Sequence, residues 1–442
     1  MVPDDMLWGA ASAAYQIEGA PDADGKGPSI WDVFTHQPGR VRDGHTGDVA
    51  CDHYRRWPED VELLAGLGVG AYRFSVSWPR VLPDGRGEVN RPGLDFYDRL
   101  VDALCERSIT PVLTLFHWDL PQALEEKGGW LNRDTALCFA EYADVVAARL
   151  ADRVPLWITL NEPFVHMAYG YAMGLHAPGH ALLTGALPVA HHQLLAHGLA
   201  VRALRARGAE RVLLTNNCTP VWPASESPAD RAAADAYDAL HNRLFADPVL
   251  LGRYPDLSAY GDGLDAAVRG DDLEIIASPI DGLGVNYYNP TRIAAPAEPG
   301  GLPFDIAEIT GYPTTAFGWP VVPDGLRELL TGLRDRYGPA LPPIYVTENG
   351  CSQPDTPDER GEIDDRARIA YLDGHLKALD AARAEGVDVR GYFVWSLTDN
   401  FEWAEGYHQR FGLVHVDFAT QRRTPKASYR WYRDEIARRR AG

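Results

Sequence analysis

Short apolar runs rich in β-branched residues alternate along the whole chain with longer amphipathic segments. The runs that predict strands are LWGAAS (7–12), AYRFSVSW (71–78), TPVLTLFHW (110–118), LWITLNEP (156–163), RVLLTNNC (211–218), IDGLGVNYYN (280–289), PIYVTENG (343–350) and VRGYFVWSL (389–397). Between them, residues 133–152 and 364–386 place apolar residues at steps of three and four, and the second segment ends on a glycine, so both predict helices. Eight β–α units in one chain predict an α/β protein that folds as a parallel (β/α)₈ TIM barrel.

The chain shows no internal boundary between domains. It contains no Ser/Gly-rich linker and no shift in composition, so we expect residues 1–442 to form a single barrel domain. Residues 20–55 and 290–325 are rich in Gly, Pro and Asp and have no clear period. We expect them to be long loops that build a substrate cleft at the C-terminal face of the barrel.

Composition narrows the choice of partners and of location. The 42 Lys and Arg residues against 62 Asp and Glu residues give a net charge of −20, which disfavours nucleic acid and membrane surfaces as partners. No apolar run is long enough to span a bilayer. The five cysteines are widely spaced and form no C-x-x-C motif, so neither a disulfide framework nor a zinc site is expected. The first residues lack the apolar segment of a signal peptide, which favours a cytoplasmic protein, and homo-oligomerisation stays open.

Two predicted strands end on a glutamate beside an asparagine, in Asn161–Glu162 and in Glu348–Asn349. Polar residues at the C-terminal ends of barrel strands point into the active site. The other strand ends supply neutral hydrogen-bonding groups, charged groups and aromatic rings, namely Gln16, Glu18, Arg73, His117, Trp118, Asp119, Asn217, Asn286, Tyr287, Tyr288, Trp395, Glu402 and Trp403. Aromatic faces pack on the apolar face of a sugar ring, and amides and carboxylates pair with its hydroxyls, so this set predicts a neutral carbohydrate as substrate.

The two strand-end glutamates match the chemistry of glycosidic bond cleavage. One carboxylic acid protonates the leaving oxygen, and the other carboxylate attacks the anomeric carbon if the two groups lie about 5 Å apart, which retains the configuration. A carboxylate beside Arg73 or Tyr288 would stay ionised and act as the nucleophile, and the other glutamate would be held protonated by that charge. These arguments leave open which glutamate has which role.

Other interpretations of the same residues compete with this one. Arg73 could form a purely structural ion pair, and His117 could be an ordinary core histidine. The HHQLLAH stretch (191–197) lacks the H-E-x-x-H pattern and predicts a solvated or core-lining helix. A metal-dependent barrel hydrolase would need H-x-H at the end of the first strand, where AAYQIEG stands, and an inactive sugar-binding barrel would have no need of both carboxylates.

Over residues 6–435 the chain resembles glycoside hydrolase family 1, the β-glucosidase family. The motifs that carry this resemblance are WGAASAAYQIEG, FHWD, TLNEP, NYY, VTENG and WSLTDNFEWAEGYHQRFGLVHVDF. The resemblance implies a retaining exo-β-glycosidase that acts on terminal β-D-glucosyl residues of neutral O-glycosides through a covalent glycosyl–enzyme intermediate. It also implies side activity on β-galactosides and β-fucosides, transglycosylation, a small-molecule glycoside or oligosaccharide as partner, and neither a cofactor nor a metal.

The same resemblance implies a role for each site residue. Glu162 would be the general acid/base and Glu348 the nucleophile, which Arg73 would support. The residues that would bind the substrate are Gln16, His117, Asn161, Tyr288, Trp395, Glu402 and Trp403. A glutamate at position 402 favours a non-phosphorylated sugar, and Phe164 and Asn217 would lie on the leaving-group side.

Overall fold

Eight parallel strands close into a barrel in this computed structural model, which describes residues 6–298 and 300–441. Residues 1–5, on which the expectation of a cytoplasmic protein partly rests, lie outside the described residues. The barrel strands are β1 (Leu7–Ala11), β2 (Ala71–Ser75), β3 (Thr110–Phe116), β4 (Leu156–Asn161), β5 (Arg211–Asn217), β7 (Gly282–Asn286), β10 (Ile344–Asn349) and β11 (Val389–Trp395). Each pairs with the next, and β1 pairs with β11 to close the ring. All eight predicted strands are confirmed, and each ends one to three residues earlier than predicted.

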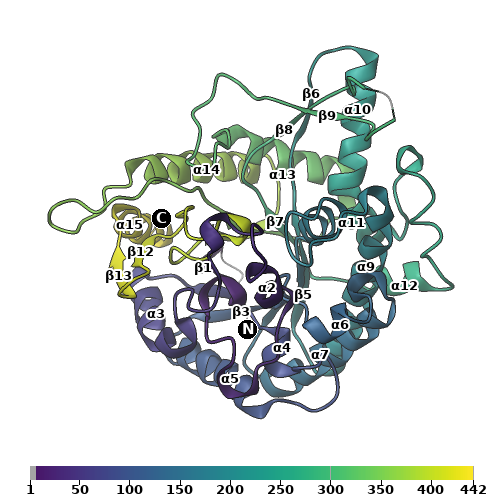
Figure 1. Ribbon diagram of the computed structural model, residues 1–442. Coiled ribbons are helices and arrows are strands. Elements are labelled where there is room, and N and C mark those ends of the chain that lie inside the picture. Colours follow the sequence, from purple (N-terminus) through teal and green to yellow (C-terminus); the bar gives the residue numbers. More distant parts are fainter. Residues whose placement is uncertain (1–5, 299, 442) are drawn as a thin grey trace.

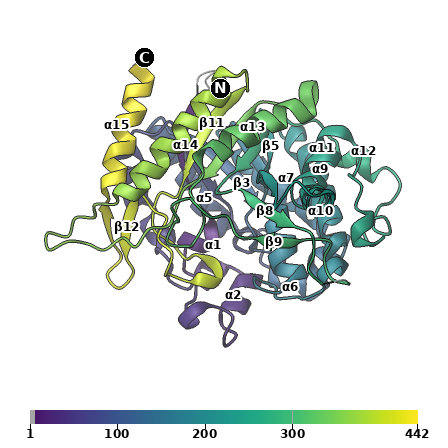
Figure 2. The ribbon, with the colours of Figure 1, turned by 90° about the horizontal axis from the view of Figure 1, so that it is seen from above.

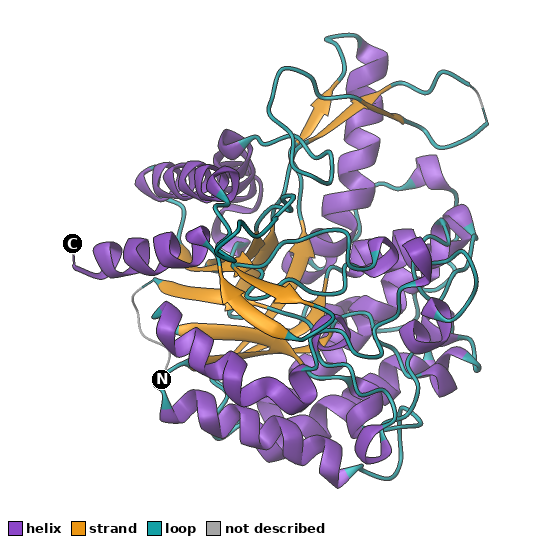
Figure 3. Ribbon diagram, turned by 60° about the vertical axis from the view of Figure 1, so that its left-hand side comes forward, coloured by secondary structure: helices purple, strands orange, loops and turns teal. Residues whose placement is uncertain are grey.

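Helices surround the barrel on its outer side, as Figures 1 and 3 show. The long ones are α3 (His53–Leu67), α5 (Arg91–Glu106), α7 (Asp134–Leu150), α9 (Leu187–Ala206), α10 (Pro228–Asp238), α13 (Pro323–Tyr337), α14 (Arg366–Ala384) and α15 (Ala427–Ala441). The helices predicted at 133–152 and 364–386 are α7 and α14. Short helices lie in the loops: α1 (Ala14–Ile17), α2 (Ile30–Thr35), α4 (Trp78–Val81), α6 (Gln122–Glu125), α8 (Pro163–Val165), α11 (Leu244–Leu251) and α12 (Asp272–Ile276).

Alternation of side chains along the strands produces two apolar layers. Residues such as Leu7, Val112, Ile158 and Phe393 fill the inside of the barrel, and a larger apolar layer lies between the strands and the helices. A side chain at Gly9 would place its Cβ 2.3 Å from the Phe393 ring, so only glycine fits this position of the interior. The barrel is therefore a filled core, and its open end is formed by loops.

The long β–α segments contain small sheets that the sequence pattern did not predict. Strands β6 (Val221–Pro223), β8 (Thr291–Ala294) and β9 (Asp305–Ala307) form a three-stranded sheet that contacts α10, and β12 (Val414–Asp417) pairs with β13 (Arg422–Pro425). In Figure 2, α1, α2 and β9 lie at one end of the barrel and the end of α15 lies at the other. Among the described helices, none combines the length and the apolar character that crossing a bilayer requires.

Candidate active site

Glu162 and Glu348, which lie nearly two hundred positions apart in the sequence, line the same cavity of about 860 Å³. Glu348 is part of β10, and Glu162 follows β4 directly. Both side chains are almost fully buried, with 5% of Glu162 and 3% of Glu348 exposed. Segment 290–325 supplies many of the residues that line the cavity, as predicted, whereas segment 20–55 contributes only Arg40.

Backbone geometry directs the Glu162 side chain. Its φ of 47° lies in the left-handed region, and Pro163 then begins α8. Trp118 (φ 78°) and Trp403 (φ 48°), which line the same cavity, share this unusual conformation. Non-glycine residues in this region cost of order 1–3 kcal/mol each and concentrate at functional sites. Three of them around one cavity indicate that local backbone strain is maintained here to place side chains.

The Glu348 carboxyl group contacts a cation and a phenol. Arg73 Nη1 donates to Oε1 at 2.6 Å, and the Tyr288 hydroxyl donates to Oε2 at 2.7 Å. Burial raises the pKa of Glu348, whereas the charge of Arg73 and the bond from Tyr288 lower it. Both partners therefore favour the ionised form of this carboxylate. Arg73 does form an ion pair, and its partner is the carboxylate of Glu348, which lines the cavity.

The Glu162 carboxyl group contacts neutral amides. Asn286 Nδ2 donates to Oε1 at 2.8 Å, and Asn217 Nδ2 donates to the same oxygen at 3.0 Å. Burial, together with the negative charge of Glu348, raises the pKa of Glu162 to about 8. At neutral pH Glu162 therefore holds a proton. Among the described residues it has no cationic partner like the Arg73 that contacts Glu348, so its protonated form is favoured, as a general acid requires.

Asn161 and His117 connect the two glutamates to the rest of the site. Asn161 Oδ1 accepts bonds from Arg73 and Asn286, and its Nδ2 donates to His117 Nε2 at 3.0 Å. His117 Nε2 thus has no proton, and burial with the nearby charge of Arg73 lowers the pKa of this ring well below its ordinary value. The proton of His117 must lie on Nδ1, which is buried and has no partner within the protein. That free donor is available to a hydroxyl of a ligand.

Aromatic rings and a third carboxyl group form the wall next to His117. The His117 ring stacks on Trp395 at 5.8 Å and on Trp403 at 6.0 Å. Gln16 Nε2 donates to Glu402 Oε2 at 3.3 Å, and the buried Oε1 of Gln16 has no partner. Glu402, Trp395 and Trp403 line the cavity, whereas Gln16 reaches it through its bond to Glu402. Burial raises the pKa of Glu402 to about 8, and the charge of Glu348 adds to this effect.

The predicted leaving-group residues lie on another wall of the cavity. Phe164 stacks on His241 with ring centroids 3.9 Å apart, and His241 in turn bonds to Asn217 Oδ1 at 3.0 Å. Asn217 thus donates to Glu162 on one side, and on its other side it is held by His241, which stacks on Phe164. Six large apolar side chains that line the cavity are exposed to solvent: Tyr169, Met173, Leu175, Leu183, Leu302 and Ile306.

Sequence reasoning gave no role to several residues that matter here. Asn286 Nδ2 donates to both Asn161 Oδ1 and Glu162 Oε1, and its place at a strand end is the one signal of this role in the sequence. Tyr287, its neighbour, is turned away and donates to Val322 O at 2.7 Å. Trp118 donates to the Asn161 carbonyl at 2.8 Å and contacts Trp403 at 4.6 Å.

The HHQLLAH stretch is a core-lining part of α9, as predicted. Its three histidines are buried and contact separate partners: His191 bonds to Asp272 and Tyr254, His192 to the Trp130 carbonyl, and His197 to Thr159. The five cysteines are free thiols.

Comparisons with known proteins identify the family of the chain. The sequence profile of glycosyl hydrolase family 1 matches residues 1–441. A thermostable β-glucosidase B from Thermobispora bispora is 52% identical over 441 residues, which cover 99% of this chain and 90% of that protein. A bifunctional β-D-glucosidase/β-D-fucosidase from Bifidobacterium breve is 45% identical over 460 aligned residues, which cover 98% of each chain.

A solved structure shows the same fold over nearly the whole chain. The crystal structure of a psychrophilic β-glucosidase from Micrococcus antarcticus superposes with a TM-score of 0.95 at 49% identity, covering 98% of this chain and 97% of the other. The expected (β/α)₈ fold and the resemblance that the motifs indicated are both confirmed. The chain belongs to glycosyl hydrolase family 1.

Proposed function

We propose that the protein is a retaining exo-acting β-glucosidase whose single barrel domain, residues 1–442, carries the whole reaction. The observation that supports this most strongly is the difference between the two carboxyl environments. Glu348 contacts Arg73 and Tyr288, whereas Glu162 contacts only neutral amides. The homologues from Thermobispora bispora and Micrococcus antarcticus are named β-glucosidases, which supports the same activity.

In the first step, ionised Glu348 attacks the anomeric carbon while Glu162 gives its proton to the leaving oxygen. The products are a glycosyl ester on Glu348 and the free alcohol. Ester formation removes the charge of Glu348, so the pKa of Glu162 falls and this residue becomes a base. In the second step Glu162 takes a proton from water, which attacks the ester and releases the sugar with its original configuration.

We propose that Gln16, His117, Asn161, Trp395, Glu402 and Trp403 bind the sugar ring, while Arg73 and Tyr288 hold the nucleophile. The unpartnered His117 Nδ1 and Gln16 Oε1 support this role, since buried polar atoms of folded proteins are nearly always bonded. The bifunctional relative from Bifidobacterium breve supports β-fucosides as a second substrate.

The role of Glu162 has a direct test. The change Glu162→Ala should slow cleavage of aryl glucosides with poor leaving groups by a large factor. Dinitrophenyl glucosides should keep most of their first-step rate, because their leaving group departs without protonation. Pre-steady-state rates for both substrates measure the difference, and equal losses for both would contradict the assignment.

The exposed apolar side chains of the cavity support a further statement about the substrate. Six of the twelve large apolar side chains that are exposed in the described part of the chain line this cavity. Exposed apolar patches of this kind mark binding surfaces. We therefore propose that aryl and long alkyl glucosides are better substrates than cellobiose, whose leaving group is a polar sugar.

A double variant tests this preference. Ile306 and Leu302 are 70% and 42% exposed, so Leu302→Ser with Ile306→Ser removes apolar surface without opening the core. We expect kcat/KM for octyl glucoside to fall by about tenfold, as loss of one or two apolar contacts does, while the value for cellobiose stays unchanged. Leu137→Ser on α7, 52% exposed and outside the cavity wall, is the matched control. A parallel loss for both substrates would contradict the proposal.

A further inference from the structure

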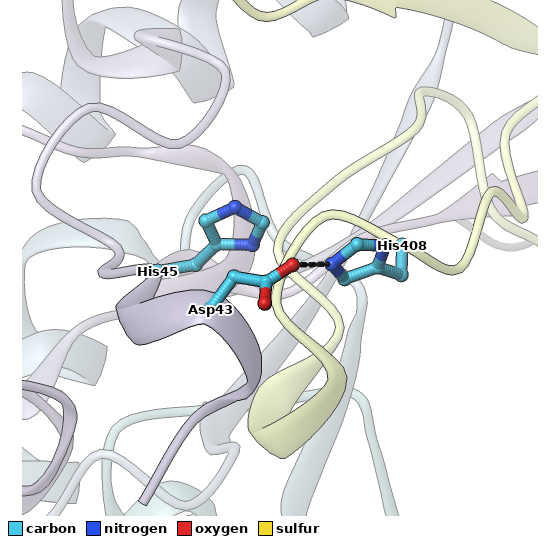
Figure 4. Close-up of side chains that lie close together, drawn as sticks. All are labelled: Asp43, His45 and His408. Atoms are coloured by element: carbon cyan, nitrogen blue, oxygen red, sulfur yellow. Dashed lines mark hydrogen bonds and ion pairs between the residues drawn. The ribbon is translucent and has the colours of Figure 1, made fainter. Parts of the chain in front are cut away.

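Two loops near the glycone wall bring together two imidazoles and a carboxylate that the reaction does not use. Asp43 belongs to η2 (Arg42–Gly44) in the loop between β1 and α3, and His45 follows it. His408 comes from the loop after η9 (Trp403–Glu405), more than 360 positions away in the sequence. Figure 4 shows the three side chains pointing toward one another. Within the described residues, this is the one group of three such ligands close enough to hold a metal ion.

The distances within the group suit a small divalent ion. One donor atom from each of Asp43, His45 and His408 lies within 4.8 Å of the other two, and His408 Nε2 is 2.7 Å from Asp43 Oδ2. Zinc bonds to nitrogen and oxygen measure about 2.0–2.1 Å, which places tetrahedral donors about 3.3 Å apart. The His408–Asp43 pair would therefore open by about half an ångström and His45 would move inward, within the range of side-chain motion.

The loops that carry the three ligands are already fixed to each other. Arg42 Nη1 donates to Glu405 Oε2 at 3.2 Å, and the Tyr407 hydroxyl donates to the Thr46 carbonyl at 2.7 Å. A Cβ at Gly406 would come within 2.5 Å of His45 Nδ1, so glycine at this position lets the imidazole reach the second loop. An ion would thus meet a site whose backbone is largely preformed.

The group is open to solvent. The Tyr407 N–H donates to His45 Nδ1 at 3.2 Å and orients this ring. Asp43 and His408 remain exposed to solvent, so water can complete the coordination and the ion can enter.

We propose that Asp43, His45 and His408 form a binding site for one divalent transition-metal ion, with Zn²⁺ as the representative and water as the fourth ligand. Two imidazoles and one carboxylate select Zn²⁺, Co²⁺, Ni²⁺ or Cu²⁺ over Mg²⁺ and Ca²⁺, which prefer oxygen ligands. Binding of the ion replaces the hydrogen bond between His408 Nε2 and Asp43 Oδ2. It would link the β1–α3 loop to the loop that positions Glu402 and Trp403, so it stabilises one wall of the sugar site without taking part in the chemistry.

Isothermal titration of the EDTA-treated enzyme with ZnCl₂ tests the site without any measurement of activity. We expect one Zn²⁺ per chain, and we expect His45→Ala, His408→Ala and Asp43→Asn each to weaken binding at least about tenfold. All three residues are at least partly exposed, and circular dichroism of each variant checks that it is folded. MgCl₂ should give no comparable binding.

His36 provides the matched control. Its Nε2 lies 3.1 Å from Asp48 Oδ2, so it is an exposed histidine–aspartate pair that belongs to no described group of three ligands. His36→Ala should leave the zinc affinity unchanged. Absence of zinc binding to the unaltered enzyme, or equal affinity in the enzyme and all three ligand variants, would overturn the proposal.

Discussion

The charge of Glu348 should raise the pKa of Glu162 by an amount that can be calculated, and replacing Glu348 with glutamine measures that amount. Glutamine keeps the shape of the side chain and removes the charge. The pKa of Glu162 stands at about 8, raised first by burial and second by Glu348. Two carboxylates about 5.5 Å apart, the separation typical of retaining enzymes, repel each other by about 3 kcal/mol at an effective dielectric constant of about 20. That energy corresponds to about 2 pKa units.

We therefore expect the pKa of Glu162 to fall to about 6 in the Glu348→Gln variant, and to stay above the ordinary value because burial remains. Carbon-13 NMR of protein labelled at the glutamate side-chain carboxyl measures this pKa, and the resonance is assigned by its loss in Glu162→Gln. Glu106→Gln, whose side chain is 75% exposed on α5, is the control that should change nothing. A Glu162 pKa that is unchanged by Glu348→Gln would show that the two groups are not coupled, and the roles assigned to them would then lose their electrostatic basis.

Two further predictions follow from the same contacts. Tyr288→Phe removes the 2.7 Å bond to Glu348. Since hydrogen bonds to charged groups contribute about 1.5–3 kcal/mol, kcat should fall by roughly 10–100-fold with little change in KM. Steady-state kinetics that show an unchanged kcat would contradict this role of Tyr288. The folded-state pKa of Glu162 exceeds its unfolded value, so the folded protein binds more protons between about pH 4.5 and 8 and loses stability as pH rises through that window. Glu162→Gln removes this effect, and thermal unfolding should show the variant to be more stable than the parent at pH 8, by on the order of 4 kcal/mol, with a smaller difference at pH 5. An equal difference at both pH values would mean that burial does not perturb this carboxyl.

The barrel could be predicted from the sequence because its strands leave a strong signal. Each central strand is buried on both sides, so LWITLN and IYVTEN stand out as apolar, β-branched runs, and amphipathic helices separate them. The small β6–β8–β9 sheet could not be found in this way, because strands of three or four residues contain too few positions to show a period. The last strand residues were also assigned too far along the chain, since Tyr287 and Tyr288 continue the apolar run after the ladder has ended.

The candidate site was predictable where function depends on residue type and not where it depends on distance. Two strand-end glutamates, each beside an asparagine, indicated a pair of carboxyl groups facing one sugar. The residues did not say which glutamate Arg73 contacts, because that depends on how β2 and β10 face each other across the barrel. Asp43, His45 and His408 raised no signal at all, since the first two are far from the third in sequence and the three form no motif.

The central claim is that Glu348 attacks the sugar and Glu162 serves as acid and base. The most direct measurement is the product formed by Glu348→Gly from an activated aryl β-glucoside in the presence of azide. Azide should restore cleavage and yield the α-glucosyl azide, because it replaces the missing carboxylate on the face opposite the leaving group. Recovery of the β-glucosyl azide from this variant would show that the nucleophile is still present and that the two roles have been exchanged.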